Sequence, residues 1–143
     1  WEADTVAGKQ TGPRLVTLVD RKSRFTLVGL AKDKSAESVM RTIIDLLEGY
    51  HSQVKTITYD NGKEFAGHEE IAKHSDSKAY FAHPYSSWER GLNENTNGLI
   101  RQYLPKGTEF KPVNDKQCQF IMDRLNNRTR KCLGYRTPNQ VFE

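Results

Sequence analysis

Three acidic residues in this sequence stand where their carboxylates could share metal ions. Asp4 lies inside a first β-type run, Asp60 ends a later one, and Glu94 lies in a predicted helix. Carboxylate oxygens suit Mg²⁺, a hard cation that keeps several of its waters. Two such ions can activate an attacking oxygen and stabilise a leaving one in phosphodiester cleavage. The residue types therefore favour phosphoryl chemistry, provided that the fold brings the three together.

Each of these acids also has a plainer interpretation. Asp60 is followed by Asn61 and Gly62, and Asp, Asn and Gly are the common residues of turns. We interpret Asp20 as a turn residue and Glu64 as an acid that suits the start of a helix. Residue type alone leaves both turn formation and metal ligation open for Asp60.

Apolar patterning predicts the elements that must position these side chains. Strands are expected at residues 1–9, 14–20, 24–31, 54–60 and 78–84, and helices at 35–50, 64–76, 86–104 and 115–134. Ser35 is the predicted N-cap of the first helix. Its predicted buried positions are Val39, Ile43, Leu46 or Leu47 and Tyr50; those of the last helix are Phe120, Ile121 and Leu125. This order predicts an α/β fold, a mixed sheet with helices on its faces.

The helix predicted at 86–104 has an unusual polar face. Its expected core stripe is Leu92, Thr96, Leu99 and Tyr103. Glu94 lies on the other side, with Arg90, Gly91, Asn97, Gly98 and Arg101. Each glycine costs a helix about 1 kcal/mol relative to alanine. Either a bulky partner such as a DNA backbone approaches this face, or the segment is a poor helix or a loop.

Charge is distributed unevenly along the 143 residues. The net charge is +4, and the excess lies in residues 86–143, which hold 10 Lys or Arg against 6 Asp or Glu. A basic cluster within this part consists of Arg124, Arg128, Arg130 and Lys131. It could meet nucleic-acid phosphates or be a solvated helix face.

Composition excludes several classes of protein. No apolar run is long enough for a membrane span. Cys118 and Cys132 are too few for a disulfide scaffold and lack the paired spacing of a zinc site, so free thiols are expected. The length indicates one domain, residues 1–143, and the missing initiator Met suggests a fragment of a longer protein.

Three short sequence motifs resemble those of a known family. "WEAD" at 1–4, "YDNGKEF" at 59–65 and "NENTNGLIRQYLPKG" at 93–107 resemble the DDE transposase and integrase family. The likeness is strongest to bacterial insertion-sequence transposases of the IS-thirty group, with retroviral integrases as more distant relatives. It runs from "WEADTV" to "LGYRTPNQVFE", almost the whole chain.

The resemblance implies a ribonuclease-H-like fold, a mixed five-stranded sheet flanked by helices, and a catalytic core domain. It implies that Asp4, Asp60 and Glu94 are the catalytic residues and the ligands of two Mg²⁺ or Mn²⁺ ions. The implied enzyme is a polynucleotidyl transferase that cleaves DNA with water and then joins the freed 3′-hydroxyl to target DNA. The alternatives are a ribonuclease-H-type nuclease and a non-catalytic DNA-binding or assembly module derived from a transposase.

The expected partner is DNA, both transposon ends and target. Arg101 matches the basic residue that the family carries after its glutamate, and Asn97 and Arg90 share the Glu94 face. Tyr85 is a candidate for stacking on a base, and Lys106 for meeting a phosphate. The resemblance also implies a homodimer or higher oligomer, located in the bacterial cytoplasm at the nucleoid and not in a membrane.

Overall fold

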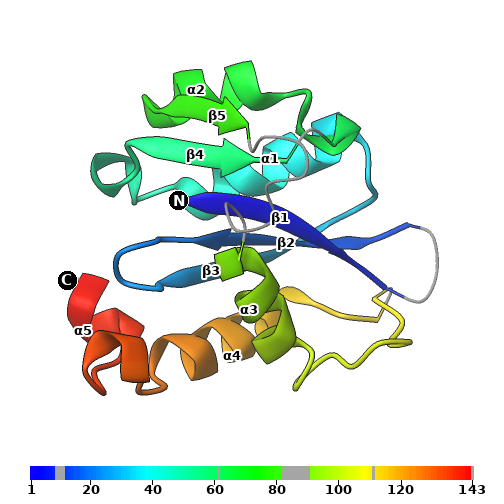
Figure 1. Ribbon diagram of the computed structural model, residues 1–143. Coiled ribbons are helices and arrows are strands. Elements are labelled where there is room, and N and C mark those ends of the chain that lie inside the picture. The colour runs from blue at the N-terminus through cyan, green and yellow to red at the C-terminus, as the bar shows by residue number, and fades with distance from the viewer. Residues whose placement is uncertain (9–11, 61, 82–90, 111, 143) are drawn as a thin grey trace.

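The computed structural model describes residues 1–8, 12–60, 62–81, 91–110 and 112–142, without the side chains of residues 91–94. Within these ranges, five strands form one mixed sheet in the order β3-β2-β1-β4-β5 (Figure 1). The strands are β1 Glu2–Ala7, β2 Arg14–Val19, β3 Thr26–Ala31, β4 Thr56–Tyr59 and β5 Lys78–Phe81. Strands β1 to β3 pair antiparallel, whereas β4 pairs parallel with both β1 and β5. The predicted five-stranded mixed sheet is confirmed.

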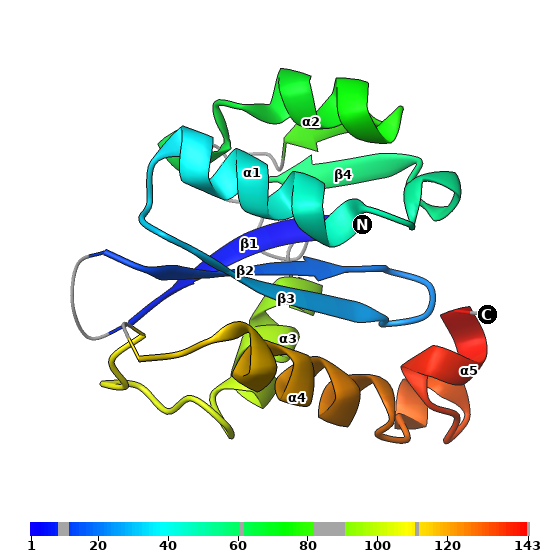
Figure 2. The ribbon, with the colours of Figure 1, turned by 180° about the vertical axis from the view of Figure 1, so that it is seen from behind.

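Helices cover both faces of this sheet. Helices α1 Ala36–Leu47 and α2 His68–Ser75 lie on one face, and α3 Gly91–Ile100, α4 Asp115–Asn126 and α5 Pro138–Phe142 lie on the other (Figures 1 and 2). The short 3-10 helices are η1 His51–Gln53, η2 Lys63–Phe65 and η4 Lys131–Leu133. None of the helices in the described ranges is long and apolar enough to cross a membrane.

The core has two parts because the strands alternate their side chains between the two faces. Val16 packs into the cluster under α1, and its neighbour Leu15 packs into the cluster under α3 and α4. Leu27 and Val28 on β3 divide in the same way. Burial on both faces explains why these strands read as nearly continuous apolar runs.

The first helix forms where predicted but ends at Leu47 rather than residue 50, so Tyr50 lies beyond it and is half-buried. The Ser35 side chain accepts a hydrogen bond from the Ser38 amide at 3.2 Å and caps the helix. Val39, Ile43 and Leu47 are its buried residues. The Asp20 carboxylate accepts hydrogen bonds from both the amide and the hydroxyl of Ser23, which confirms a turn role for Asp20.

The last predicted helix is wrong in its end and in one of its buried residues. Helix α4 ends at Asn126 instead of residue 134, and at this end the Asn126 side-chain amide exchanges two hydrogen bonds with the Thr26 backbone of β3, at 2.8 and 2.9 Å. Ile121 and Leu125 are buried as predicted, whereas Phe120 is 52% exposed. Cys118 takes the inward position instead, and it and Cys132 are free thiols.

The helix expected at 86–104 is described from Gly91 onward and ends at Ile100. Thr96 is buried as predicted, together with Ile100 and with Leu104 beyond the helix end, while Leu99 and Tyr103 are half-buried at their side. The side chain of Leu92 lies outside the described set. For Leu99 and Tyr103 the prediction chose the neighbouring row, because both rows have helical spacing and only the packing on the sheet separates them.

Candidate active site

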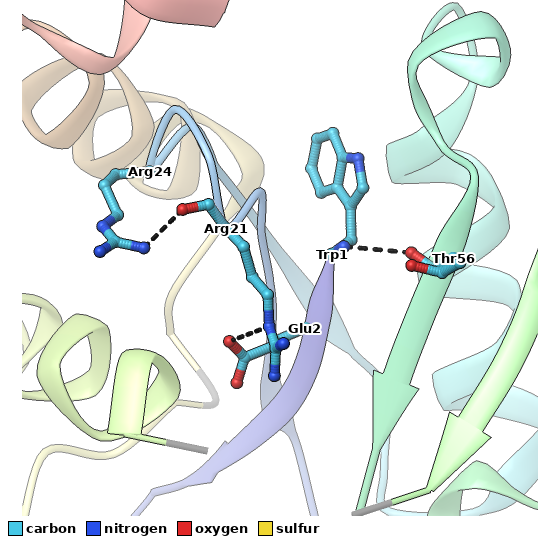
Figure 3. A network of polar contacts seen from close by, with 5 residues as sticks. All are labelled: Trp1, Glu2, Arg21, Arg24 and Thr56. Carbon is cyan, nitrogen blue, oxygen red and sulfur yellow. Dashed lines mark hydrogen bonds and ion pairs between the residues drawn. The ribbon is translucent and has the colours of Figure 1, made fainter. Parts of the chain in front are cut away.

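Strand β1 is anchored at its start by two contacts (Figure 3). The Trp1 backbone nitrogen donates to the Thr56 carbonyl oxygen on β4 at 3.0 Å. Glu2 is 2% exposed, and its Oε2 accepts a hydrogen bond from Arg21 Nε at 3.0 Å. The other Glu2 oxygen, Oε1, is buried and has no hydrogen-bond partner among the described residues. These contacts fix the strand that carries Asp4.

Asp4 projects toward α3. It follows Glu2 by two positions on the strand, so both side chains leave the same face of the sheet. Asp4 Oδ1 accepts a hydrogen bond from the Thr5 amide at 2.9 Å, and Oδ2 accepts one from Asn97 Nδ2 at 2.9 Å. The half-buried carboxylate is therefore held by its own strand and by a helix 93 positions further along the chain.

Asp60 lies directly beyond the end of β4, beside Asp4. Strand β4 runs parallel to β1 with Glu2 opposite Thr58, and two residues further along each strand come Asp4 and Asp60. The register thus brings both acids to one level of the sheet. Asp60 Oδ1 accepts a hydrogen bond from the Gly62 amide at 2.8 Å, so the residue does form the turn that its neighbours suggested.

A third carboxylate, that of Glu64, lies beside Asp60. A Cβ atom on Gly62 would lie 2.7 Å from Glu64 Oε2 and 2.8 Å from Asp60 Oδ1. Gly62 has a φ of −67°, which any residue can adopt, so a side chain here would not strain the backbone but would displace these two carboxylate ends. Glu64 Oε1 also accepts a long hydrogen bond from Thr5 Oγ1, at 3.3 Å. The helix predicted at 64–76 begins only at His68, as α2, so Glu64 does not open it and lies instead in the middle of η2. Sequence reasoning also did not foresee the approach of Glu64 to Asp60.

Aromatic packing holds this turn in place. The Tyr59 ring, which precedes Asp60, is 1% exposed and lies 5.0 Å from the Phe65 ring of η2 and 5.7 Å from the Phe81 ring of β5, between centroids. Burial raises the pKa of the Tyr59 hydroxyl above its ordinary value, so the group stays protonated. Two buried rings that contact each other thus lie next to Asp60 and Glu64 in the chain.

Helix α3 is tied to β1 at two places. Besides the Asn97 contact with Asp4, the Arg101 guanidinium donates to the Ala7 carbonyl oxygen at 3.0 Å and to the Leu104 carbonyl oxygen at 3.3 Å. Asn97 Oδ1 is buried without a hydrogen-bond partner among the described residues. The face of α3 toward β1 therefore keeps an unmet acceptor beside Asp4.

Glu94 lies in the same helix, one turn before Asn97, but its side chain lies outside the described set. Among the side chains that are described, no three His, Cys, Asp or Glu residues lie close enough together to hold a metal ion. The donors that are described fit a hard cation in kind, because the Asp4 and Asp60 carboxylates lie at one level of the sheet and Asn97 Oδ1 is an unmet oxygen acceptor. Convergence of Asp4, Asp60 and Glu94 stays a prediction.

The predicted DNA contacts are distributed around this region. Lys106 is exposed after α3, and Asn97 and Arg101 make the internal contacts given above. Tyr85 and Arg90 fall outside the described residues. A DNA role for all five stays a prediction. Gly98 is exposed, with no atom within 4 Å of where its Cβ would lie, so a partner has room to approach this face.

Comparison with known proteins identifies the family. Residues 1–87 match the model of the integrase core domain family. The chain belongs to this family. It is 49% identical, over 142 residues, to the transposase for insertion sequence element IS4351 of Bacteroides fragilis. It is 41% identical, over 144 residues, to the transposase InsI for insertion sequence element IS30A of Escherichia coli strain K12. The predicted likeness to IS-thirty transposases is confirmed.

These alignments cover 99% and 100% of the chain but only 44% and 37% of the relatives, so the chain spans less than half their length. Among solved structures, the HTLV-2 integrase catalytic core domain in complex with magnesium (trimeric form) superposes with a TM-score of 0.75. It covers 100% of this chain and 95% of that one, at 21% identity. The predicted ribonuclease-H-like fold of integrase cores is thereby confirmed.

Proposed function

We propose that this integrase core domain is the catalytic core of a DNA transposase, a polynucleotidyl transferase. The observation that carries the proposal is the position of Asp4 and Asp60 at one level of neighbouring parallel strands, in a chain 49% and 41% identical to two insertion-sequence transposases. The proposed substrate is the DNA of the transposon ends and of the target. The proposed location of the whole protein is the bacterial cytoplasm, at the nucleoid, where this DNA lies.

The proposed reaction has two displacements at phosphorus. In the first, a water oxygen forms a bond to phosphorus and the bond to the 3′-oxygen breaks, so that oxygen takes a proton and leaves as a hydroxyl. In the second, the same 3′-hydroxyl forms a bond to a target phosphorus and displaces a target 3′-oxygen. Both steps need the attacking oxygen, the phosphorus and the leaving oxygen in line.

Asp4, Asp60 and Glu94 are the residues proposed to hold two Mg²⁺ or Mn²⁺ ions. When bound, such ions activate the attacking oxygen and stabilise the leaving one. The Asn97 amide fixes the rotamer of Asp4 by its hydrogen bond to Oδ2. The Gly62 amide does the same for Asp60, and both the Asp60 and the Glu64 carboxylate lie next to the place where a Cβ of residue 62 would be. These contacts orient the proposed ligands before substrate arrives.

The test is a strand-transfer assay of the full-length protein with cognate end DNA and Mg²⁺ or Mn²⁺. Asp60→Asn and Glu94→Gln are each expected to lose more activity than the about 10–100-fold typical when a group that only orients a ligand is removed. Asp76→Asn and Glu69→Gln are matched controls, because both residues are exposed on or beside α2. Unchanged transfer in either site variant would refute the proposal, and cleavage of an RNA–DNA hybrid instead of end DNA would favour the nuclease.

We further infer that the complete protein works as a homodimer or higher oligomer, because strand transfer joins two ends to one target. The HTLV-2 integrase core has been solved in a trimeric form, which supports association of such cores. Sedimentation of the full-length protein with and without end DNA tests this, and a monomer in the active complex would contradict it.

A further inference from the structure

A second concave surface lies at the far end of α3, against α4. We call it the arginine–aromatic groove; its volume is about 500 Å³, and it is lined by Tyr103, Phe120, Asp123, Arg124, Asn127 and Arg128. Tyr103 follows α3 directly, and the other residues lie on α4 or just after it. The groove therefore adjoins the helix that carries Asn97, at the end away from Gly91.

Phe120 forms an unusually open aromatic wall of this groove. Its side chain is on the outer side of α4 and is 52% exposed. The Tyr103 ring meets it edge-on with 6.1 Å between centroids, and the Arg124 guanidinium carbon lies 5.4 Å from its centroid. A guanidinium next to an exposed ring is a combination that suits both a phosphate and the face of a base.

The arginines around the groove lack acidic partners. The ion pairs among the described residues are Arg21–Glu2, Arg41–Glu37 and Lys73–Glu70. Arg124, Arg128 and Arg130 are in none of them. Arg128 instead donates to Gln102 Oε1 at 3.2 Å, and the nearby acid Asp123 accepts at Oδ1 from Gln119 at 2.8 Å.

These positive charges also repel one another. The pKa of the Arg130 guanidinium is lowered first by burial and then by the charges of Arg24 and Arg128, with Cys132 acting in the opposite sense. Arg24 is held near by its hydrogen bond to the Arg21 carbonyl oxygen in the β2–β3 turn (Figure 3). The two arginines that line the groove outnumber its one acid, Asp123, so the surface keeps a net positive charge that attracts an anion.

The support for the groove is rigid. The Asn126 side chain is 5% exposed, and its two hydrogen bonds to the Thr26 backbone fix the end of α4 on β3. Arg124 lies two residues before this clamp and Arg128 two residues after it. The guanidinium groups are thus mounted on a fixed backbone, which lowers the entropy lost when a ligand binds.

We propose that the arginine–aromatic groove binds a DNA strand outside the catalytic carboxylates, with Arg124 and Arg128 on phosphates and Phe120 against a base. A second copy of the chain is the other occupant to consider, but a self-complementary contact would bring the same unpaired arginines from both sides. A polyanion matches the positive charge of the groove, and α3 runs between Asp4 and the groove. The proposal goes beyond the proposed function because binding in the groove requires neither cleavage nor strand transfer.

Fluorescence anisotropy of the chain with a labelled oligothymidine strand of about 20 nucleotides tests the proposal, in EDTA over a salt series. The double variant Arg124→Gln, Arg128→Gln is expected to bind about tenfold more weakly at low salt. The slope of log affinity against log salt should fall by about 1.4, as for two lost phosphate contacts on a single strand. Phe120→Leu keeps an apolar side chain but removes the aromatic face, and an about fivefold loss is expected.

The matched control is Arg41→Gln, Lys73→Gln, which removes the same charge from exposed residues of α1 and α2 on the opposite face of the sheet. It should bind nearly as the unmodified chain does. An equal loss in both double variants would show a general charge effect and overturn the proposal, as would no loss in the groove variant. A groove variant that loses only self-association by sedimentation would assign the groove to a second copy. The anisotropy measurement needs neither a metal ion nor a reaction, so a failed strand-transfer assay would refute the proposed function without refuting DNA binding in the groove.

Discussion

The two faces of the sheet differ in how completely their polar groups are matched. On the α1 and α2 face, exposed Arg41 and Lys73 each pair with an acid of their own helix. On the α3 and α4 face, buried Glu2 Oε1 and Asn97 Oδ1 have no hydrogen-bond partner among the described residues. Buried polar atoms without partners cost free energy, so their persistence on one face indicates function there more than stability.

The apolar interior does not share this asymmetry. Each face contributes a cluster of fully buried residues, with Ile43 of α1 in one and Ile100 of α3 in the other, both 0% exposed. The difference therefore lies at the polar layer around Asp4 and along α4, while both helical layers are packed on the sheet. Three predictions test this comparison, from the largest expected effect to the smallest.

The largest effect is expected from a substitution on the α1 and α2 face of the sheet. Ile43→Ala should lower the free energy of unfolding by about 2–5 kcal/mol, because it leaves a cavity in the core under α1. Phe120→Ala on the other face should change it by about 1 kcal/mol or less, since the ring is half in solvent. Urea unfolding of both variants measures the difference. Equal losses would mean that Phe120 is a core residue and that the faces do not differ as described.

An intermediate effect is expected from the polar layer. Asn97→Ala should lower strand transfer by the full-length protein about 10–100-fold, because Asp4 loses the amide that orients it. The Mn²⁺ concentration for half-maximal activity should rise, a shift that a merely structural role would not produce. The control is Asn95→Ala, an exposed residue of the same helix. Activity lost together with the thermal transition, at unchanged Mn²⁺ demand, would contradict a positioning role.

The smallest effect concerns the inner side of α4. Burial, with a contribution from Asp115, raises the pKa of the Cys118 thiol to about 11. Above its ordinary pKa of 9.0 the thiol ionises in the unfolded chain first, so stability should fall as pH rises from about 9 to about 11. Urea midpoints at both ends of this range should show a smaller fall in Cys118→Ala than in Cys132→Ala, which keeps the buried thiol. Identical falls would mean that Cys118 is open to solvent.

Much of the fold could be predicted because it depends on the local spacing of apolar residues and on capping residues. Continuous apolar runs predicted the strands, and Ser35 with Val39, Ile43 and Leu47 predicted α1. The errors lie where distant contacts decide. Helix α4 ends at Asn126, whose side chain bonds a backbone 100 positions earlier in the chain, and helical periodicity does not contain such a contact. Phe120 has core spacing by sequence, but Cys118 takes the inward direction.

The candidate site divides in the same way. The sequence motifs that resemble the family predicted Asp4, Asp60 and Glu94 as the site, and the pairing of β1 with β4 explains why the first two lie close together. Glu64 approaches Asp60 around Gly62, and Asn97 reaches Asp4 across 93 positions. From the sequence alone Gly62 reads as a turn residue, and only its φ of −67° in the structure shows that the backbone there does not require glycine.

The two hydrogen-bonded contacts between β1 and the α3 segment constrain how the helix that contains Glu94 can move. Asn97 donates a hydrogen bond to Asp4, and Arg101, directly after the helix, donates one to the Ala7 carbonyl oxygen. Sliding the helix by one turn along the strand would break both hydrogen bonds at once. A shift of α3 along β1 would therefore first have to break the hydrogen bond between Asn97 and Asp4, whereas a small pivot about Asn97 would keep it.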